Sequence, residues 1–218
     1  MTKLFDGVFR LDGKLATRNL VPHARVYGEE LKAVGGTEYR MWNPYRSKLA
    51  AALLNGMKTM AIGSGSNVLY LGAANGTTCS HVSDIVGMNG SVFCVELSKR
   101  SMRDLINVCE SRENMLPIFA NAENVQEYQE DVGEVDVIYQ DVSARDQAGI
   151  LLKNSGMLIS NGLAYVAIKS QSIDVSKKPD VVFKEFIETV SGVFRVRETV
   201  KLEPFDSMHL FVVFEKKA

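Results

Sequence analysis

Strand-like and helix-like segments alternate from residue 67 onward, and this alternation limits the fold more than any other feature of the sequence. Short runs rich in β-branched and aromatic residues occur at 67–71, 91–95, 115–119, 135–139 and 163–168. Between them, apolar residues recur at helical spacing over 77–87, 99–112, 124–131 and 146–158. Strands that alternate with helices form βαβ units, so we expect an α/β fold with a mostly parallel, doubly wound sheet and helices on both faces.

Both ends of the chain depart from this alternation. Residues 1–40 contain short apolar runs separated by Asp6-Gly7 and Asp12-Gly13, which are typical of hairpin turns and predict a small antiparallel β unit. Near the other end, a helical pattern over 179–191 precedes two strand-like runs, FRVRETVKL and SMHLFVVFEKK. These runs predict a terminal hairpin that closes the sheet with an antiparallel strand.

The segment SKLAAALLNG marks the start of the larger unit. Ser47 is a helix-capping residue, and we expect the helix that follows it to end near Gly56. We therefore divide the chain into a small N-terminal β domain, 1–46, and a second domain, 47–218. The stretch 56–66 is the only linker candidate.

Charge and cysteine content exclude several classes of protein. The chain has 25 Lys and Arg against 26 Asp and Glu, so a nucleic-acid substrate is not expected to be held by this chain alone. Three cysteines without a C-x-x-C pair argue against both a disulfide framework and a zinc site, and we predict no metal. No run approaches about 20 apolar residues and the N-terminus has no apolar signal region, so we predict a cytoplasmic protein without a membrane segment.

Polar or small residues follow each predicted parallel strand. Ligands of doubly wound sheets bind outside the carboxyl ends of the strands, so these residues are the candidate site. Small residues let a ligand approach the backbone, and Thr77 can cap the next helix. Glu96 can accept hydrogen bonds from the two hydroxyls of an adenosine ribose. The residues concerned are Gly72, Ala73, Thr77 and Thr78 in the first loop, then Glu96, Asn121, Ala122, Asp141 and Lys169.

Two ligand classes suit this edge of the sheet, a nicotinamide cofactor and S-adenosylmethionine. The nicotinamide alternative has one match, because Tyr165 and Lys169 have the Y-x-x-x-K spacing of short-chain dehydrogenases. In a strand, however, two residues four apart are about 13 Å from each other at ~3.3 Å per residue, too far to act as a pair. A pyrophosphate prefers bare amides at a helix N-terminus and often a lysine, whereas the loop GAANGTT offers an Asn and two threonines, which favours a ligand without phosphates.

Several strings resemble fibrillarin, the guide-RNA-directed 2′-O-methyltransferase. They are NPYRSKLAAALLNG, VLYLGAANGTTCSHVSDIVG, VFCVELSKRSMRDL, VDVIYQDVSARDQA and IKSQSID, and the resemblance spans residues 3–216. The chain lacks the glycine- and arginine-rich tail of the eukaryotic proteins and is expected to be of the archaeal type. The resemblance implies a class I, Rossmann-like S-adenosylmethionine-dependent methyltransferase fold behind a small N-terminal antiparallel β domain.

The resemblance also implies functions for single residues. The proposed catalytic set of the family falls on Lys48, Asp141, Lys169 and His209. Among these, we hypothesise that Lys169 lies nearest the 2′-oxygen, that Asp141 orients it and that Lys48 steadies the nucleotide. The residues implied to contact S-adenosylmethionine are Gly72, Ala73, Thr77, Thr78, Glu96, Leu97, Asn121, Ala122, Asp141, Val142, Ser143 and Ala144.

This sequence departs from the family pattern at two places. Asn121 stands where the family usually has Asp, so its contact with the adenine amino group loses charge assistance. Ser143 and Ala144 stand where the family usually has Ala-Gln.

The family resemblance implies partners as well as an activity. They are a C/D-box guide RNA, target rRNA and tRNA, a Nop-family scaffold protein and a kink-turn-binding protein of ribosomal type. A nicotinamide oxidoreductase and a non-catalytic assembly module are the competing hypotheses. Trp42 and Tyr45 in MWNPYRSK can stack on a base, but we expect both to pack the two domains together. We expect His81 to be structural.

Overall fold

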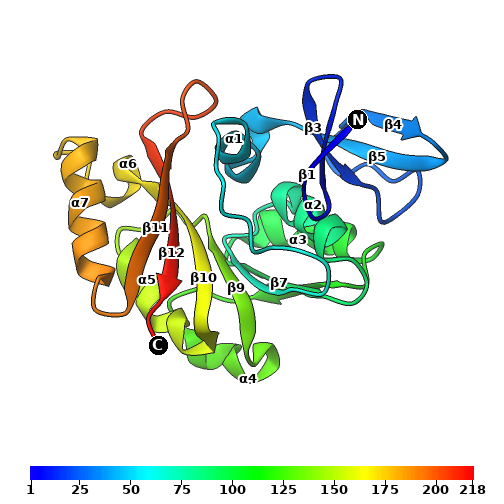
Figure 1. Ribbon diagram of the computed structural model, residues 1–218. Coiled ribbons are helices and arrows are strands. Elements are labelled where there is room, and N and C mark those ends of the chain that lie inside the picture. The colour runs from blue at the N-terminus through cyan, green and yellow to red at the C-terminus, as the bar shows by residue number, and fades with distance from the viewer.

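The computed structural model describes residues 1–218 and contains two β-sheets with helices between and behind them (Figure 1). The N-terminal sheet has five antiparallel strands in the order β1-β2-β3-β5-β4. Asp12 and Gly13 both have positive φ angles in the β2–β3 turn, as a two-residue hairpin turn requires. The predicted antiparallel unit is thus confirmed. Its strands are β1 (Thr2–Phe5), β2 (Val8–Leu11), β3 (Lys14–Arg18), β4 (Leu31–Val34) and β5 (Thr37–Trp42).

The larger sheet has seven strands in the order β11-β12-β10-β9-β6-β7-β8. β12 pairs antiparallel with both β10 and β11, while the pairings among β6 to β10 are parallel. The predicted doubly wound sheet and its antiparallel terminal strand are therefore confirmed. Its strands are β6 (Asn67–Leu71), β7 (Ser91–Glu96), β8 (Met115–Phe119), β9 (Val135–Gln140), β10 (Leu158–Lys169), β11 (Phe194–Lys201) and β12 (His209–Lys216).

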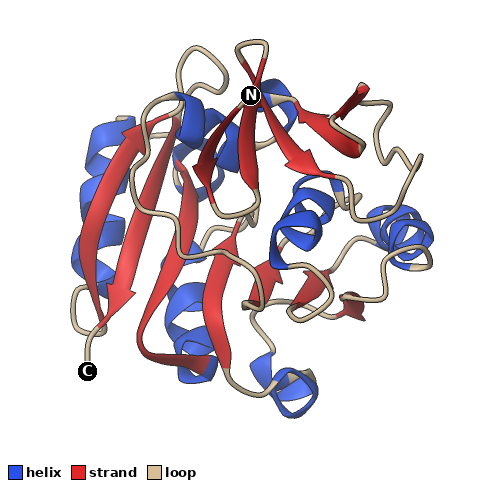
Figure 2. Cartoon of the chain, turned by 45° about the vertical axis from the view of Figure 1, so that its right-hand side comes forward, coloured by secondary structure: helices blue, strands red, loops and turns tan.

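The helices cover both faces of this sheet (Figures 1 and 2). Residues of α1, α2 and α3 share one apolar cluster with the sheet, and residues of α4, α5 and α7 share the cluster on the other face. Ser47 caps α1 as predicted, since its Oγ accepts a hydrogen bond from Ala50 N at 3.3 Å. The helices are α1 (Lys48–Leu54), α2 (Thr77–Val86), α3 (Lys99–Cys109), α4 (Gln129–Val132), α5 (Gln147–Asn154), α6 (Ser170–Ile173) and α7 (Pro179–Val190).

Two predicted helices are shorter than the sequence pattern indicates. The segment 124–131 divides into a 3-10 turn, η2 (Val125–Glu127), and the four-residue α4. Tyr128 between them is buried and has non-helical angles, because its hydroxyl donates to Asn154 Oδ1 at 2.6 Å. The helix predicted over 146–158 ends at Asn154, since the chain tightens into η3 (Ser155–Met157) and Leu158 then pairs with Val135.

The stretch 56–66 is not a loose linker. Met57 and Ile62 are buried in the same apolar cluster as α1 and α2. The backbone amides of Lys58 and Thr59 donate to the Glu198 carboxylate at 2.8 Å each. The prediction failed because glycine and serine content says nothing about the few apolar residues that fix such a segment to the core.

A buried polar network joins the N-terminal sheet to α2. Arg40 of β5 contacts Glu29 (2.6 Å) and Asp84 of α2 (2.9 Å), and Arg112 contacts the other oxygen of Asp84 at 2.7 Å. All four side chains are at most 2% exposed. Removing one partner of such a buried pair typically costs about 3–5 kcal/mol. The network therefore holds the N-terminal sheet to the helix that begins at the predicted ligand loop.

His81 and Trp42 pack within this junction. Their rings are stacked with centroids 4.7 Å apart, and Trp42 is 2% exposed. Thr17 Oγ1 donates to Asp84, so His81 Nδ1 donates to Thr17 Oγ1 at 2.8 Å and His81 Nε2 accepts from Tyr27. Burial holds the pKa of His81 well below 6.5. Both residues are structural, as predicted.

No helix in the chain is both long enough and apolar enough to cross a membrane. The three cysteines are free; Cys79 and Cys94 are buried and Cys109 is half-buried.

Candidate active site

A cavity of about 770 Å³ lies outside the carboxyl ends of β6 to β10. It is lined by all twelve residues that the sequence predicts for cofactor binding, and by Lys48 and Lys169. His209 lies instead in a neighbouring hollow between α7 and the β11–β12 connection. Parallel strands bring residues from positions 72 to 169 to one edge of the sheet, which is why the strand-end prediction succeeds.

Gly72 fixes the loop after β6 against the end of β9. Its φ is +83°, and a Cβ atom at this position would lie 2.8 Å from the carbonyl oxygen of Asp141. Only glycine accommodates both the left-handed backbone and this contact. The loop and Asp141 are thereby held together at the floor of the cavity.

The amino end of α2 faces the cavity without a side-chain cap. The N-cap is Gly76 rather than Thr77, whose predicted capping role is wrong because Thr77 is already the first helical residue. The Thr78 hydroxyl donates to Ser47 Oγ at 3.1 Å and accepts from no amide of the helix. The uncapped backbone amides of α2 can therefore bind a carboxylate.

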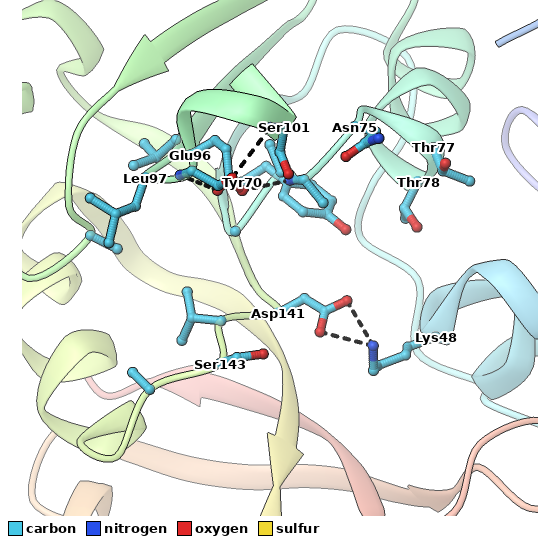
Figure 3. Close-up of a pocket in the computed structure, with 18 of the residues that line it drawn as sticks. Lys48, Tyr70, Asn75, Thr77, Thr78, Glu96, Leu97, Ser101, Asp141 and Ser143 are labelled. Atoms are coloured by element: carbon cyan, nitrogen blue, oxygen red, sulfur yellow. Dashed lines mark hydrogen bonds and ion pairs between the residues drawn. The ribbon is translucent and has the colours of Figure 1, made fainter. Parts of the chain in front are cut away.

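Glu96 is oriented by the backbone of two loops (Figure 3). Its Oε2 accepts from Ala74 N at 2.8 Å, and its Oε1 accepts from Ser98 N at 2.7 Å. Each oxygen keeps one further acceptor site, so the carboxylate can accept from the two hydroxyls of a ribose. This geometry agrees with the predicted function of Glu96.

The next strand end offers a slot for a flat ring. Asn121 Oδ1 accepts from Glu123 N at 3.0 Å, which fixes the side chain and leaves one acceptor position on Oδ1 and the NH2 group available. Ala122 is 7% exposed and Leu97 is 60% exposed, so the slot has one buried wall and one open apolar wall. An uncharged amide between apolar walls suits a purine base.

Asp141 lies between two ammonium groups. Its Oδ1 is 3.0 Å from Lys48 Nζ and 2.8 Å from Lys169 Nζ, and its Oδ2 accepts from Lys48 at 3.1 Å. Figure 3 shows Asp141 and Lys48 facing each other, with Thr77, Thr78 and Glu96 on the other side of the cavity. Oδ1 is buried against the two ammonium groups and receives no well-directed hydrogen bond.

The two lysines differ in the number of partners that they already have. Lys169 Nζ contacts three acceptors, namely Asp141 O (2.8 Å), Ser143 Oγ (3.1 Å) and Asp141 Oδ1. Lys48 Nζ contacts the Asp141 carboxylate and, at 3.8 Å, Asp206 Oδ2. An ammonium has three donors, and hydrogen bonds within the chain use one of Lys48 and two of Lys169, so Lys48 retains more donors for a ligand.

His209 joins this cluster through a residue that the sequence reading missed. His209 Nδ1 is 2.6 Å from Asp206 Oδ1, and the other oxygen of Asp206 faces Lys48. Asp206 lies in a connection between strands and matches no motif. Its spacing of three residues from His209 is the only signal that could have found it.

Comparison with known proteins places the chain in a family. The fibrillarin family profile matches residues 1–218. The chain belongs to the fibrillarin family. A fibrillarin-like rRNA/tRNA 2′-O-methyltransferase of Thermococcus gammatolerans is 49% identical over 216 residues, which cover 96% of each chain.

Two solved fibrillarins have the same fold. The fibrillarin of Aeropyrum pernix, crystallised with natively bound S-adenosylmethionine, superposes with a TM-score of 0.87 at 41% identity over 98% of this chain and all of that one. The fibrillarin of a fibrillarin/Nop5p complex gives a TM-score of 0.89 at 34% identity over 99% of this chain and all of that one. The predicted methyltransferase fold is confirmed.

The dehydrogenase-like spacing of Tyr165 and Lys169 has no catalytic meaning in this fibrillarin fold. Both residues belong to β10, and Tyr165 is fully buried. Its hydroxyl accepts from Ala61 N at 2.6 Å, which ties the 56–66 segment to the sheet. The prediction that this match arises by chance is confirmed.

Proposed function

We propose that this chain is the catalytic subunit of a guide-RNA ribonucleoprotein that methylates ribose 2′-hydroxyls. It is a fibrillarin-like rRNA/tRNA 2′-O-methyltransferase that uses S-adenosylmethionine. The observation that carries the proposal is the Asp141 carboxylate, which is held between Lys48 and Lys169 on one side of a cavity that has the Glu96 carboxylate on the other.

The residues around the cavity suit each part of S-adenosylmethionine. The uncapped amides of α2 would hold the carboxylate of its amino-acid moiety, and Glu96 would accept from the ribose hydroxyls. Asn121 and the apolar walls would hold the adenine. No lysine or arginine cradles a phosphate in the loop after β6, which counts against a dinucleotide.

Once bound, S-adenosylmethionine supplies an electrophilic methyl group, and the chain must place a weak nucleophile in line with it. The Asp141 carboxylate, which is negatively charged and lines the cavity, would accept the hydrogen bond of the 2′-hydroxyl. Lys48 would use a remaining donor to hold the 2′-oxygen. Lys169 would anchor Asp141 and Ser143 beside the cofactor.

These functions of Lys48 and Lys169 differ from the hypothesis based on the sequence, in which Lys169 lies nearest the 2′-oxygen. Asp206 and His209 would complete the proposed catalytic set, Asp206 by positioning both His209 and Lys48.

The chain has no excess of Lys and Arg, whose phosphate contacts dominate affinity for nucleic acid. This balance supports selection of the RNA by partners rather than by this chain alone. Fibrillarin is found in complex with Nop5p. We propose a C/D-box guide RNA, a Nop-family scaffold and a kink-turn-binding protein of ribosomal type as partners, and target rRNA and tRNA as substrates. We also propose the domain boundary between residues 46 and 47, where the 3-10 turn η1 (Pro44–Arg46) meets the cap of α1.

Two measurements test this proposal. Calorimetric titration with S-adenosylmethionine and NAD in parallel should give binding of the first alone, and binding of NAD alone would overturn the proposal. Methyl transfer to a target RNA should require the guide RNA and scaffold. In the assembled particle, Asp141→Asn should abolish transfer, whereas a purely structural subunit would keep any activity of the particle unchanged.

A further inference from the structure

Arg46 is a cation beside the active-site cavity that has no anionic partner. It is the last residue of η1, is exposed, and lines the cavity two positions before Lys48. The other two basic residues of the lining, Lys48 and Lys169, both contact the Asp141 carboxylate. Arg46 forms no ion pair and no side-chain hydrogen bond within the chain. Its positive charge is therefore available to an anion.

The carboxylates near Arg46 are already paired with other cations. Arg46, Glu29 and Glu30 also line a hollow of about 480 Å³ beside the cavity. Glu29 is 2.6 Å from Arg40, and Glu30 is 3.5 Å from Lys14. Neither carboxylate pairs with Arg46, so the chain itself does not neutralise this guanidinium.

The ring of Tyr27 orients the Arg46 guanidinium. Its Cζ lies over the ring, 5.1 Å from the centroid. Tyr27 is itself fixed, because its hydroxyl donates to His81 Nε2 at 2.7 Å and accepts from Asn43 N at 3.3 Å. A cation–π contact favours one placement of the guanidinium and leaves its N–H donors unused. The connection between β3 and β4 thus orients Arg46 before a ligand binds.

Arg46 and Lys48 have a fixed relation to each other. Ser47 between them is 4% exposed, and its Oγ accepts from Ala50 N at 3.3 Å and from the Thr78 hydroxyl at 3.1 Å. The backbone is thereby anchored to both α1 and α2, and two residues span at most about 7 Å. Arg46 is therefore placed to contact a group next to the one that Lys48 holds on the same ligand.

A phosphate of the target RNA suits this cation best. The planar guanidinium offers paired N–H donors that match two phosphate oxygens. S-adenosylmethionine has no phosphate, and the uncapped amides of α2 suit its carboxylate. An A-form helix displays its 2′-hydroxyls along a wide, shallow minor groove, where proteins contact them together with phosphates. Both groups can therefore reach the site while the acceptor nucleotide stays paired with the guide.

We infer that Arg46, oriented by Tyr27, binds a phosphate next to the acceptor ribose while Lys48 and Asp141 engage its 2′-oxygen. The inference rests on the proposed function. A phosphate contact fixes the position of a strand and carries no sequence information, so it is compatible with selection by a guide. A single contact of this kind aligns the ribose and agrees with the balanced charge of the chain.

The test uses the full chain assembled with its guide RNA and scaffold, under single-turnover conditions with saturating target RNA and S-adenosylmethionine. Arg46→Ala should lower the methylation rate about tenfold, as for loss of one hydrogen bond to a charged group. Its affinity for S-adenosylmethionine, measured by calorimetry, should not change. Arg10→Ala, which removes an exposed arginine of β2 outside the cavity lining, is the matched control.

Variants of Tyr27 test how Arg46 is oriented. Tyr27→Phe keeps the ring and should retain the methylation rate. Tyr27→Leu removes the π face and should slow the wild type but not the Arg46→Ala variant, because the two residues act through one contact.

Two further readouts report on the phosphate itself. A phosphorothioate is placed in turn at each phosphate that flanks the acceptor ribose, and one diastereomer should slow the wild type but not Arg46→Ala. The rate should also depend less steeply on salt in Arg46→Ala. The slope of log rate against log KCl concentration should differ from that of the wild type by roughly 0.7–0.9, the contribution of one phosphate.

Equal rates for wild type and Arg46→Ala, equal salt slopes, or phosphorothioate effects that persist in Arg46→Ala would overturn the inference. A slow Arg46→Ala variant with weakened S-adenosylmethionine binding would do the same, and so would a Tyr27→Leu variant as fast as wild type. Absence of 2′-O-methylation by the wild-type particle would instead refute the proposed function.

Discussion

Replacing each lysine of the Asp141 cluster by methionine should separate the reacting lysine from the anchoring one. Methionine keeps most of the apolar stem and removes the ammonium. Lys169 has three acceptors within 3.1 Å, all of them on Asp141 and Ser143. Lys48 contacts only carboxylates and keeps a free donor.

Lys48→Met should lower kcat by about 10²–10³, equivalent to roughly 2.7–4 kcal/mol, which is typical for loss of one preorganised donor at a reacting oxygen. It should change the free energy of unfolding by less than about 1 kcal/mol, because Lys48 is partly exposed and Asp141 keeps Lys169 as a partner. Lys169→Met should destabilise the fold by about 1–3 kcal/mol, since its polar partners lose their donor. It should also weaken S-adenosylmethionine binding.

The assays are single-turnover methylation by the assembled particle, urea unfolding of the chain and calorimetric titration with S-adenosylmethionine. Lys153→Met, on the exposed face of α5, is the matched control. A Lys48→Met variant with kcat within about threefold of wild type would refute the reasoning. If Lys169→Met lost turnover but kept normal stability and S-adenosylmethionine affinity, Lys169 would be the reacting lysine and Lys48 the anchoring one.

Gly72→Ala should lower the free energy of unfolding by about 2–4 kcal/mol in urea, because the new Cβ combines a left-handed backbone with a 2.8 Å contact to Asp141 O; unchanged stability would show that the loop moves freely. Asn121→Asp should tighten S-adenosylmethionine binding about threefold to tenfold by calorimetry, since a charged acceptor strengthens the hydrogen bond to the adenine amino group; weaker binding would exclude that contact. The pKa of His81 is depressed by burial, so the unfolded chain takes up a proton below about pH 6.5 that the folded chain does not. Stability should therefore fall as the pH is lowered below that value, and His81→Gln should reduce the slope by up to about 1.4 kcal/mol per pH unit; equal slopes in thermal unfolding would contradict a buried neutral His81.

The sequence by itself determined the elements whose signals are local. Asp-Gly turns define the N-terminal hairpins, Ser47 caps α1, and apolar runs mark the strands within a few residues. It also determined nine of the residues that line the cavity, because parallel strands bring their carboxyl ends to one edge whatever their separation along the chain. Where a distant contact overrides a local pattern, as at Tyr128, the prediction failed.

Only the tertiary structure decided how the reacting groups are arranged. Lys48 and Asp141 are 93 positions apart, and their contact depends on the packing of α1 across the end of the sheet. The same packing brings Asp206 between Lys48 and His209 and leaves Tyr45 68% exposed, with its ring against Phe205 of the second domain. The periodicity of apolar residues shows which side of a helix or strand is buried. The hydrogen-bond partners of a polar side chain depend instead on which elements pack together. The number of free donors on each lysine is therefore decided by the tertiary fold.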